Sequence, residues 1–437
     1  MTSDEPMPFP GETPASRVRK IGFWMCLAIV MGNMIGSGVF LLPASLAPYG
    51  WNAVAAWIVT IAGALCLAHV LAKLTGHFPK ARGLSALIDE SLHPIAGILI
   101  AFSYWVSVWT GVVTITVGGV SYASSLIPAL GEHTTLGVLG AIWILTFVNI
   151  IGVQAAGTVQ AVTMILKLIP LIVVAILIFV IFGREGTASL TPYPAEGLSR
   201  VSVNTAATLT LWAMIGFEAA GAVSDKVEKP EVNIPRATFI GALLTGVIYL
   251  IVCSGIALML PADEVAKSAA PFELFVARFW SPDVAPWIAF FAAISAFGAT
   301  NGWILVQGEV PLDMARRKLL PRWFAGTDAA GTPVRALLVS SIFASALVIV
   351  HGNESTESLF TFMAKLSTSA TLWLYLACTI AAFIHKVALP TAIIGLPFCL
   401  WSLWGAGWDV SLLSIALSLA GLPLYWWARR EQNKEVT

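Results

Sequence analysis

The sequence contains little charge for its length. Only 11% of its 437 residues are charged and 58% are hydrophobic, whereas a soluble protein carries about 25% charged residues. The 24 basic residues equal the 24 acidic ones, and no basic tract is present, which argues against nucleic-acid binding. This composition is that of an integral membrane protein.

Cysteine and histidine are also scarce. The five cysteines are odd in number and lie in apolar stretches, so they predict small buried side chains and neither a disulfide framework nor a CxxC metal site. The six histidines are scattered, and no HExxH, GxSxG or P-loop motif occurs. We therefore expect neither an enzyme nor direct ATP coupling, and no metal or cofactor.

Long apolar runs dominate what remains. A bilayer core of about 30 Å needs about 20 apolar residues per helix, and twelve runs qualify. The predicted spans are 21–46, 50–73, 94–127, 136–152, 158–183, 203–225, 236–260, 284–308, 334–351, 358–385, 388–407 and 410–428. The third and tenth runs are long enough to include an extramembrane turn. Residues 1–16 and 429–437 are expected to be tails, the first of them disordered, around a single membrane domain at 17–428.

The distribution of lysine and arginine predicts the orientation. With the N-terminus inside, eighteen of the 24 basic residues fall in cytoplasmic segments and four in outer loops, as the positive-inside rule requires. Both termini are therefore expected in the cytoplasm. The two remaining residues, Lys167 and Lys365, lie within apolar runs.

Two predicted spans are interrupted by glycine near their middle. Residues 32–40 read GNMIGSGVF and residues 211–218 read LWAMIGFE, with Ile35 and Ile215 180 positions apart. Matched broken helices in two halves of a chain are typical of transporters, whose freed backbone groups bind substrate. Close packing of helices through small residues is the alternative.

The first break also suggests what is bound. Unwinding at residues 36–38 would expose N–H groups at the positive end of a half-helix, which favours a carboxylate. Carbonyls freed near Ile215 could accept hydrogen bonds from an ammonium group. Together they would form a socket for an α-amino acid.

At these motifs the sequence resembles the amino acid–polyamine–organocation superfamily, and within it the basic amino acid/polyamine antiporters of the arginine/agmatine and putrescine/ornithine type. Further matches are VFLLP at 39–43, TLW at 210–212, EKP at 228–230, NIPR at 233–236, MAR at 314–316, LLP at 319–321 and GTPV at 331–334. The resemblance implies an all-α membrane fold, LeuT-like, with a five-plus-five inverted repeat (about 21–183 and 203–385) and two extra helices at 388–428. It also implies alternating access in the cell inner membrane, and a homodimer.

The resemblance also implies which residues form the substrate site. Gly36, Ser37 and Gly38 are expected at the substrate carboxylate, and Ile35, Trp212 and Ile215 near the α-amino group. Trp303 matches the tryptophan over which a guanidinium or aliphatic chain lies, and Trp212 resembles a gate above the substrate. Ser369 matches a serine of the tenth span.

Ionisable residues inside a membrane are functional hypotheses by default. Glu218 matches a glutamate of the basic-substrate antiporters, where it serves the path of cationic substrates and a gate; a structural carboxylate is the alternative. Lys167 lies in the fifth span, where related proton-coupled and neutral amino acid transporters have a lysine in place of a sodium ion. It could exchange a proton or remain a charged tether to the first span.

Three positions differ from what is expected of a transporter of cationic substrates. Lys365 could reach the outer surface or pair with Glu218, and near the vestibule it would repel a cation. Val112 stands where the arginine exchanger has an asparagine, and Ile115 where it has a methionine, so the side-chain pocket is more apolar.

These residues support two hypotheses. The first is an exchanger of cationic amino acids and polyamines, and the second is a proton-coupled transporter or exchanger of neutral amino acids that uses Lys167. A receptor or channel is a further alternative, against which the paired broken helices argue.

Overall fold

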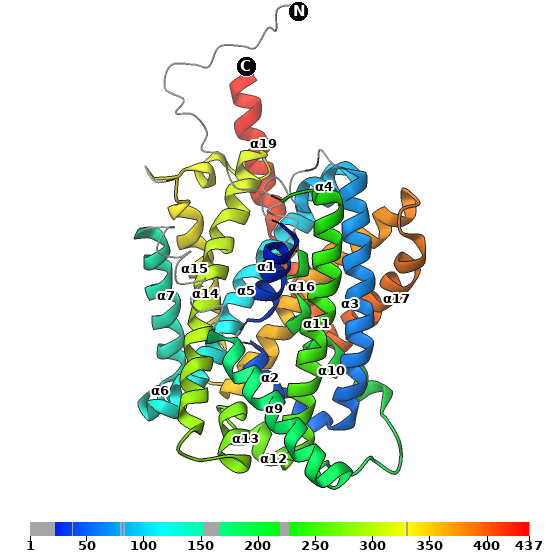
Figure 1. The fold of residues 1–437 in the computed structure, drawn as a ribbon. Coiled ribbons are helices and arrows are strands. Elements are labelled where there is room, and N and C mark those ends of the chain that lie inside the picture. The colour runs from blue at the N-terminus through cyan, green and yellow to red at the C-terminus, as the bar shows by residue number, and fades with distance from the viewer. Residues whose placement is uncertain are drawn as a thin grey trace, which may run out of the picture.

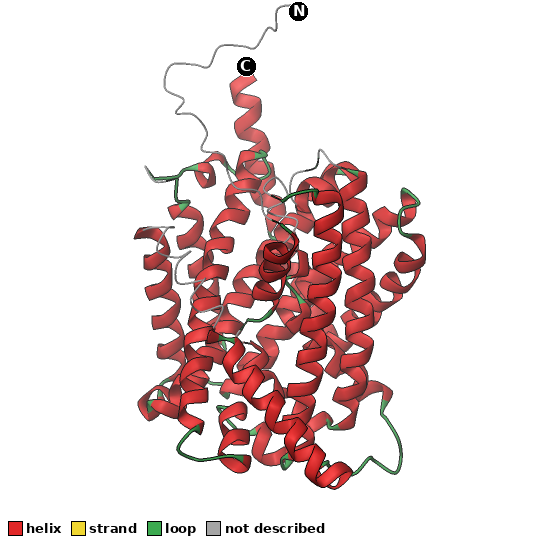
Figure 2. Cartoon of the chain, viewed as in Figure 1, coloured by secondary structure: helices red, strands yellow, loops and turns green. Residues whose placement is uncertain are grey.

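The computed structural model describes residues 22–36, 38–78, 81, 84–151, 166–218, 227–328 and 331–436. All elements in these ranges are helices (Figure 2). The longer ones are α1 (Phe23–Met34), α2 (Gly38–Leu46), α3 (Trp51–His77), α5 (Pro94–Leu126), α7 (Thr134–Ile151), α9 (Leu168–Glu185), α10 (Arg200–Met214), α11 (Pro230–Met259), α14 (Ala285–Arg316), α15 (Val334–Val350), α16 (Thr356–Ile384), α17 (Leu389–Ala406), α18 (Trp408–Leu419) and α19 (Gly421–Val436). Short connecting helices are α4 (Leu84–Ser91), α6 (Pro128–Glu132), α12 (Ala262–Ala266) and α13 (Pro271–Phe279).

The predicted all-α membrane fold is confirmed. Nine helices of the described ranges are long and apolar enough to cross a bilayer, and α1 with α2 forms a tenth span if the bent pair counts as one. The shorter helices α10 and α15 coincide with the sixth and ninth predicted spans, so the count of twelve stays a prediction. The third and tenth runs are unbroken helices, α5 and α16, without the turn we expected.

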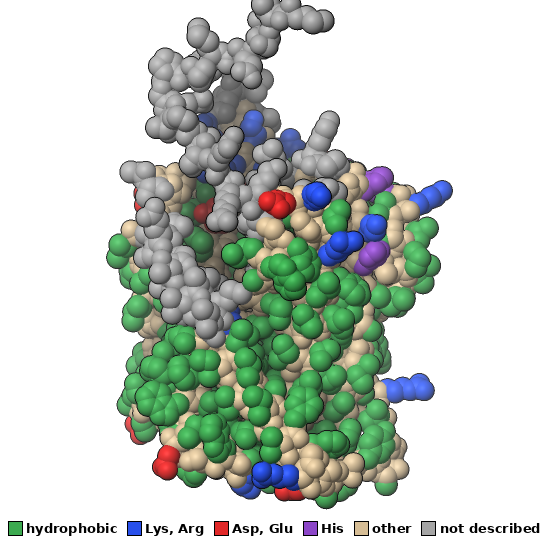
Figure 3. Space-filling view, viewed as in Figure 1, with side chains coloured by type: hydrophobic (Ala, Val, Ile, Leu, Met, Phe, Trp, Pro, Cys, Tyr) green, Lys and Arg blue, Asp and Glu red, His purple; other side chains and the backbone are tan. Residues whose placement is uncertain are grey.

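The two ends of the bundle differ. The connecting helix α4 and the end of α19 lie at one end, while α6, α12 and α13 lie at the other (Figure 1). This arrangement places predicted cytoplasmic segments together and predicted outer loops together. Figure 3 shows hydrophobic side chains across the middle of this face, with most charged side chains towards its two ends.

The predicted C-terminal tail is helical. Residues 429–436 continue α19 beyond the bundle (Figure 1). The predicted N-terminal tail at 1–16 lies outside the described residues.

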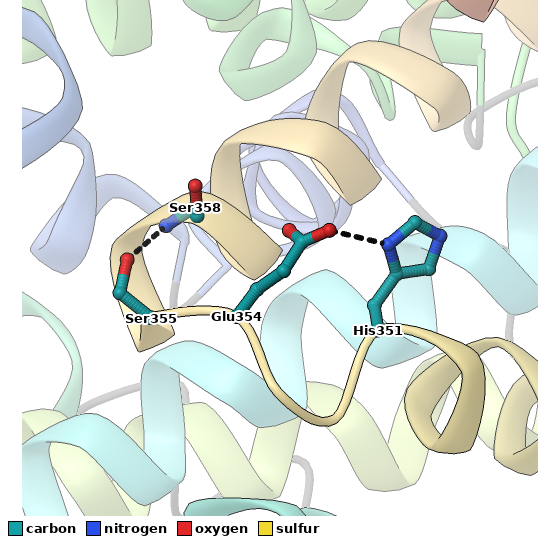
Figure 4. A network of polar contacts seen from close by, with 4 residues as sticks. All are labelled: His351, Glu354, Ser355 and Ser358. Atoms are coloured by element: carbon teal, nitrogen blue, oxygen red, sulfur yellow. Dashed lines mark hydrogen bonds and ion pairs between the residues drawn. The ribbon is translucent and has the colours of Figure 1, made fainter.

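The turn between α15 and α16 is held by its own polar groups (Figure 4). His351 Nδ1 lies 2.8 Å from Glu354 Oε1, and the Ser355 hydroxyl accepts a hydrogen bond from Ser358 N–H at 3.1 Å. Ser355 is therefore the N-cap of α16. This cap fixes where α16 begins.

Two groups of helices meet at the centre of the bundle. We call α5, α7, α14 and α15, which all contact one another, the scaffold group, and α1, α2, α10 and α11 the break group. Helix α16 contacts α5 of the scaffold group and α10 and α2 of the break group. The helix breaks predicted from sequence lie in the break group.

Candidate functional site

The first predicted break is present. Helix α1 ends at Met34 and α2 begins at Gly38, and the two are bent by 48°. The Gly36 N–H donates to Met34 O at 2.7 Å instead of continuing the helix. Within α1, Gly32 O consequently loses its normal donor, the N–H four residues on. Ser37 lies outside the described residues.

Side chains from other helices satisfy the carbonyls freed at this break. Lys167, which immediately precedes α9, donates from Nζ to Gly32 O at 2.8 Å. The Tyr249 hydroxyl of α11 donates to Met34 O at 2.8 Å. Lys167 is only 2% exposed and Tyr249 is fully buried, so both bonds are shielded from water. The ammonium of Lys167 therefore ties α9 to α1.

Proline frees a third carbonyl in α2. Pro43 lies inside the helix and has no N–H, so Val39 O has no donor four residues on. The Cys253 thiol of α11 lies 3.9 Å from this oxygen. All five cysteines are free thiols.

The second predicted break adjoins the first. Helix α10 ends at Met214, Ile215 is extended, and Gly216 has a φ of 116°, which glycine adopts without strain. A Cβ at Gly216 would lie 3.2 Å from Asn33 O and 3.3 Å from Met34 N. The backbones of the two breaks are thus in contact, and a larger residue would separate them.

A small cavity lies at this junction, with about 40 Å³ accessible to the centres of water molecules, enough for a few waters. Predicted site residues that line it are Gly36, Gly38, Trp212, Ile215 and Trp303, together with Ile115. Its wall also includes residues from the scaffold group, α11 and α16 that we did not predict. These are Ser107, Gly111, Tyr249 and Ser367.

The indole of Trp212 packs closely against Gly38. A Cβ at Gly38 would lie 1.8 Å from Cη2 and Cζ3 of the indole, a separation that no side chain allows. The indole also meets Phe360 of α16 edge-to-face, with 5.4 Å between the ring centroids. Glycine at 38 therefore makes room for the tryptophan that we expected to act as a gate.

Glu218 is buried beside the second break. Its Oε2 accepts hydrogen bonds from Gly216 N–H at 3.1 Å and from the Tyr375 hydroxyl at 3.0 Å. Its Oε1 is buried and has no partner within the part of the chain that the structure describes. The carboxyl group is thus held by α16 and by the turn after α10, with one oxygen uncommitted.

Three other residues that we singled out do not line the cavity. Ser369 is buried away from the cavity and its Oγ lies 2.9 Å from Ser414 Oγ of α18; Ser367, two residues earlier, is the serine of α16 in the cavity wall. Val112 is buried outside the wall, which Gly111 lines instead. Ile35 is buried next to the wall, at the break itself.

Lys365 is half-buried on α16 and does not line the cavity. Among the described residues, Glu218 bonds to Gly216 N–H and the Tyr375 hydroxyl and not to Lys365, whereas the charges of Asp409 and Glu357 act on Lys365.

Helix periodicity could have found some of the residues that we missed. Ser107, Gly111 and Ile115 are spaced by four and share one face of α5, so the prediction of Ile115 implied the other two. Tyr249 and Tyr375 gave no signal in the sequence, because only the folded chain brings them to a freed carbonyl and to Glu218.

Comparison with known proteins decides the family. Residues 21–435 match the family model described as amino acid permease. The chain belongs to the amino acid permease family. The resemblance to the amino acid–polyamine–organocation superfamily is therefore confirmed, and with it a membrane transporter rather than an enzyme.

Individual relatives of this permease are antiporters and polyamine transporters. It is 28% identical over 405 residues to the cadaverine/lysine antiporter of Escherichia coli strain K12, covering 90% of this chain and 91% of the relative. It is 28% identical over 424 residues to the putrescine transporter PotE of the same strain, covering 94% and 96%. The putrescine transporter PotE of Haemophilus influenzae is 26% identical over 425 residues, covering 94% and 97%.

Proposed function

We propose that this permease exchanges cationic amino acids and polyamines across the cell inner membrane by alternating access. The relatives named as a cadaverine/lysine antiporter and as putrescine transporters support this substrate class. The observation that carries the proposal is the cavity at the junction of the two helix breaks, because its walls suit both ends of a cationic amino acid.

The break end of the cavity suits an α-amino acid head group. Gly38 begins α2, where N–H groups lack helical partners and favour a carboxylate. Gly36 lines the cavity just before it, with its own N–H bonded to Met34 O. Ile215, extended after the end of α10, brings its backbone to the same cavity for the α-amino group. Ser37 would join the carboxylate ligands.

The part of the cavity wall that α5 and α16 form suits a group that only donates hydrogen bonds. Ser107 donates its hydroxyl hydrogen to Tyr104 O at 2.7 Å, and Ser367 donates its own to Ser107 O at 2.8 Å. Each hydroxyl has a single hydrogen, so only oxygen lone pairs remain to face a substrate. An ammonium or guanidinium group can use such acceptors, whereas an aliphatic end would leave them unpaired.

Two further groups favour a positive charge. Trp303 lines the cavity, and a cation placed over the face of its indole would gain about 0.5–2 kcal/mol. Glu218, with its uncommitted Oε1, would stabilise a cation that passes the turn after α10. Lys365 lies outside the cavity wall, which removes one argument against a cationic substrate.

Lys167 supports a second candidate function. Its ammonium binds Gly32 O at the first break, where a bound cation would otherwise balance the freed carbonyl. A proton gained and lost there would couple transport of neutral amino acids to a pH gradient. In both candidates we propose a permease with cytoplasmic termini that works as a homodimer.

Competition for uptake tests the proposal. Proteoliposomes preloaded with lysine take up labelled lysine, and unlabelled lysine, arginine, cadaverine, putrescine, norleucine and alanine compete in turn. We expect the four cations to compete better than norleucine, which matches lysine in length but lacks the charge. If norleucine and alanine compete while every cation fails, the cationic proposal is wrong and the neutral candidate stands.

A further inference from the structure

A buried pair of amides joins α7 to α14 near Trp303. Asn149 Nδ2 donates to Asn301 Oδ1 at 2.8 Å and lies 3.3 Å from Asn301 O. The same Nδ2 donates to Leu145 O in its own helix at 2.9 Å. Asn149 is fully buried and Asn301 is 1% exposed, so water does not compete for these bonds.

Asn301 and Trp303 point to roughly opposite sides of α14. Two residues correspond to about 200° of rotation in an α-helix, and Asn301 faces α7 while Trp303 lines the cavity. Among the described residues, no hydrogen bond holds the Trp303 indole. The rotation of α14 about its own axis therefore decides where the indole lies.

Other polar contacts of α14 also lie near Trp303. One turn further along the helix, Gln307 Nε2 donates to Ser341 Oγ of α15 at 2.9 Å. The Thr116 hydroxyl of α5 lies 3.4 Å from the Thr300 hydroxyl, a weak contact. Apolar packing between membrane helices distinguishes poorly between rotational positions of a helix. Interhelical hydrogen bonds favour one position over the others, as a single buried asparagine fixes register in coiled coils.

The pair is poorly suited to stability alone. Asn149 Oδ1 and Asn301 Nδ2 are buried without a partner among the described residues, and each unsatisfied polar group costs about 1–3 kcal/mol. Replacing both members of such a pair by apolar residues of similar size is often neutral or stabilising. A buried pair with this cost points to a role in specificity.

We propose that Asn149 and Asn301 are positioning residues that fix the rotation of α14, and so hold Trp303 beneath the side chain of the substrate. This inference rests on the proposed function, in which Trp303 is the platform for a long cationic side chain. A substrate without a long side chain would not depend on the pair.

The test compares long and short substrates in the same variants. Asn149→Leu, Asn301→Leu and the double variant are purified as folded protein, and half-saturation is measured for lysine and for alanine. We expect the value for lysine to rise about threefold or more, since interhelical hydrogen bonds of this kind are worth about 0.6 kcal/mol on average. The value for alanine should stay unchanged.

Two further variants distinguish a loss of the position of Trp303 from a general loss of transport. Asn301→Asp keeps an oxygen to accept from Asn149 Nδ2, so it should retain the wild-type lysine value. Trp143→Phe removes the bond from Trp143 Nε1 to Ser345 Oγ at 3.1 Å between α7 and α15, without touching α14, and should change neither substrate. Equal losses for lysine and alanine, or none for either, would overturn the positioning role.

Failure of the proposed function gives a different pattern. A wild-type protein that binds no cation disproves cationic exchange, and norleucine then replaces lysine as the long substrate over Trp303. A selective loss of norleucine against alanine would still support the pair, and equal behaviour would refute it.

Discussion

The scaffold and break groups use polar side chains in opposite ways. In the scaffold group, side chains bond to side chains of neighbouring intact helices. These bonds are Trp105–Ser340, Trp143–Ser345, Thr146–Ser341, Gln307–Ser341 and Asn149–Asn301. At the break group, side chains bond to backbone carbonyls that the breaks have freed, as Tyr249 of α11 and Lys167 before α9 do.

This difference separates helices that keep the bundle in register from helices that can bind a substrate or ion. Bonds between intact helices have no competitor inside a membrane, so they keep the scaffold helices in register. A freed backbone group instead needs some partner, and a substrate or ion can supply it. We therefore expect substitutions at the breaks to lower transport of every substrate. Loss of a scaffold bond that neither lines the cavity nor positions Trp303 should affect stability alone.

The largest effect is expected from Gly38→Ala. The added Cβ would lie 1.8 Å from the Trp212 ring, and overpacking of this kind costs about 1–3 kcal/mol, so uptake of lysine should fall about 10- to 100-fold. Gly140→Ala on α7 is the matched control, because no atom lies within 4 Å of a Cβ there. Wild-type uptake by a folded Gly38→Ala protein would contradict the close approach of gate and break.

Lys167→Met should have the next largest effect. Loss of the ammonium leaves Gly32 O buried without its donor, at a cost of about 1–3 kcal/mol, and transport should fall about tenfold and lose its dependence on pH. Uptake measured from pH 5 to 8 checks this, with Lys267→Met, between α12 and α13, as the control. A variant with the wild-type rate and pH profile would make Lys167 a structural residue.

Trp303→Leu should act on one end of the substrate only. Loss of the aromatic face should weaken lysine and arginine by about 2- to 30-fold, the equivalent of about 0.5–2 kcal/mol, and leave alanine unchanged. Trp287→Leu on the same helix, 61% exposed, is the control. Competition curves that shift equally for all three amino acids would argue against the platform.

The smallest effect is expected in the scaffold. Thr146→Val removes the bond to Ser341 Oγ at 2.8 Å and should lower the free energy of unfolding by about 0.6 kcal/mol. Transport of lysine should not change. A loss of transport without a loss of thermal stability would erase the distinction between the two groups.

The sequence predicted the helices and the two breaks because both depend on local composition. Apolar length identified the spans, and glycine at 36 and 216 marked where α1 and α10 end. The exact ends were less predictable. Helix α14 runs to Arg316, eight residues beyond the predicted end at 308, because its final turns are polar yet still helical.

The side-chain wall of the cavity was harder to predict because it depends on helix phase. A shift of two residues turns a side chain to roughly the opposite face, which is why Ser367 and not Ser369 reaches the cavity. A shift of one residue likewise exchanges Gly111 for Val112. Lys365 required the structure for another reason, since Asp409, one of the two carboxylates whose charge acts on it, lies in α18 and not on its own helix.

Counterflow tests the central claim most directly. Proteoliposomes with the wild-type permease are loaded with cadaverine or left empty, and the uptake of labelled lysine is followed with no pH gradient. We predict uptake only into the loaded vesicles, and its loss in Gly38→Ala but not in Gly140→Ala. Equal uptake into empty vesicles, or uptake that depends on an imposed pH gradient, would contradict exchange of cationic substrates at the helix breaks.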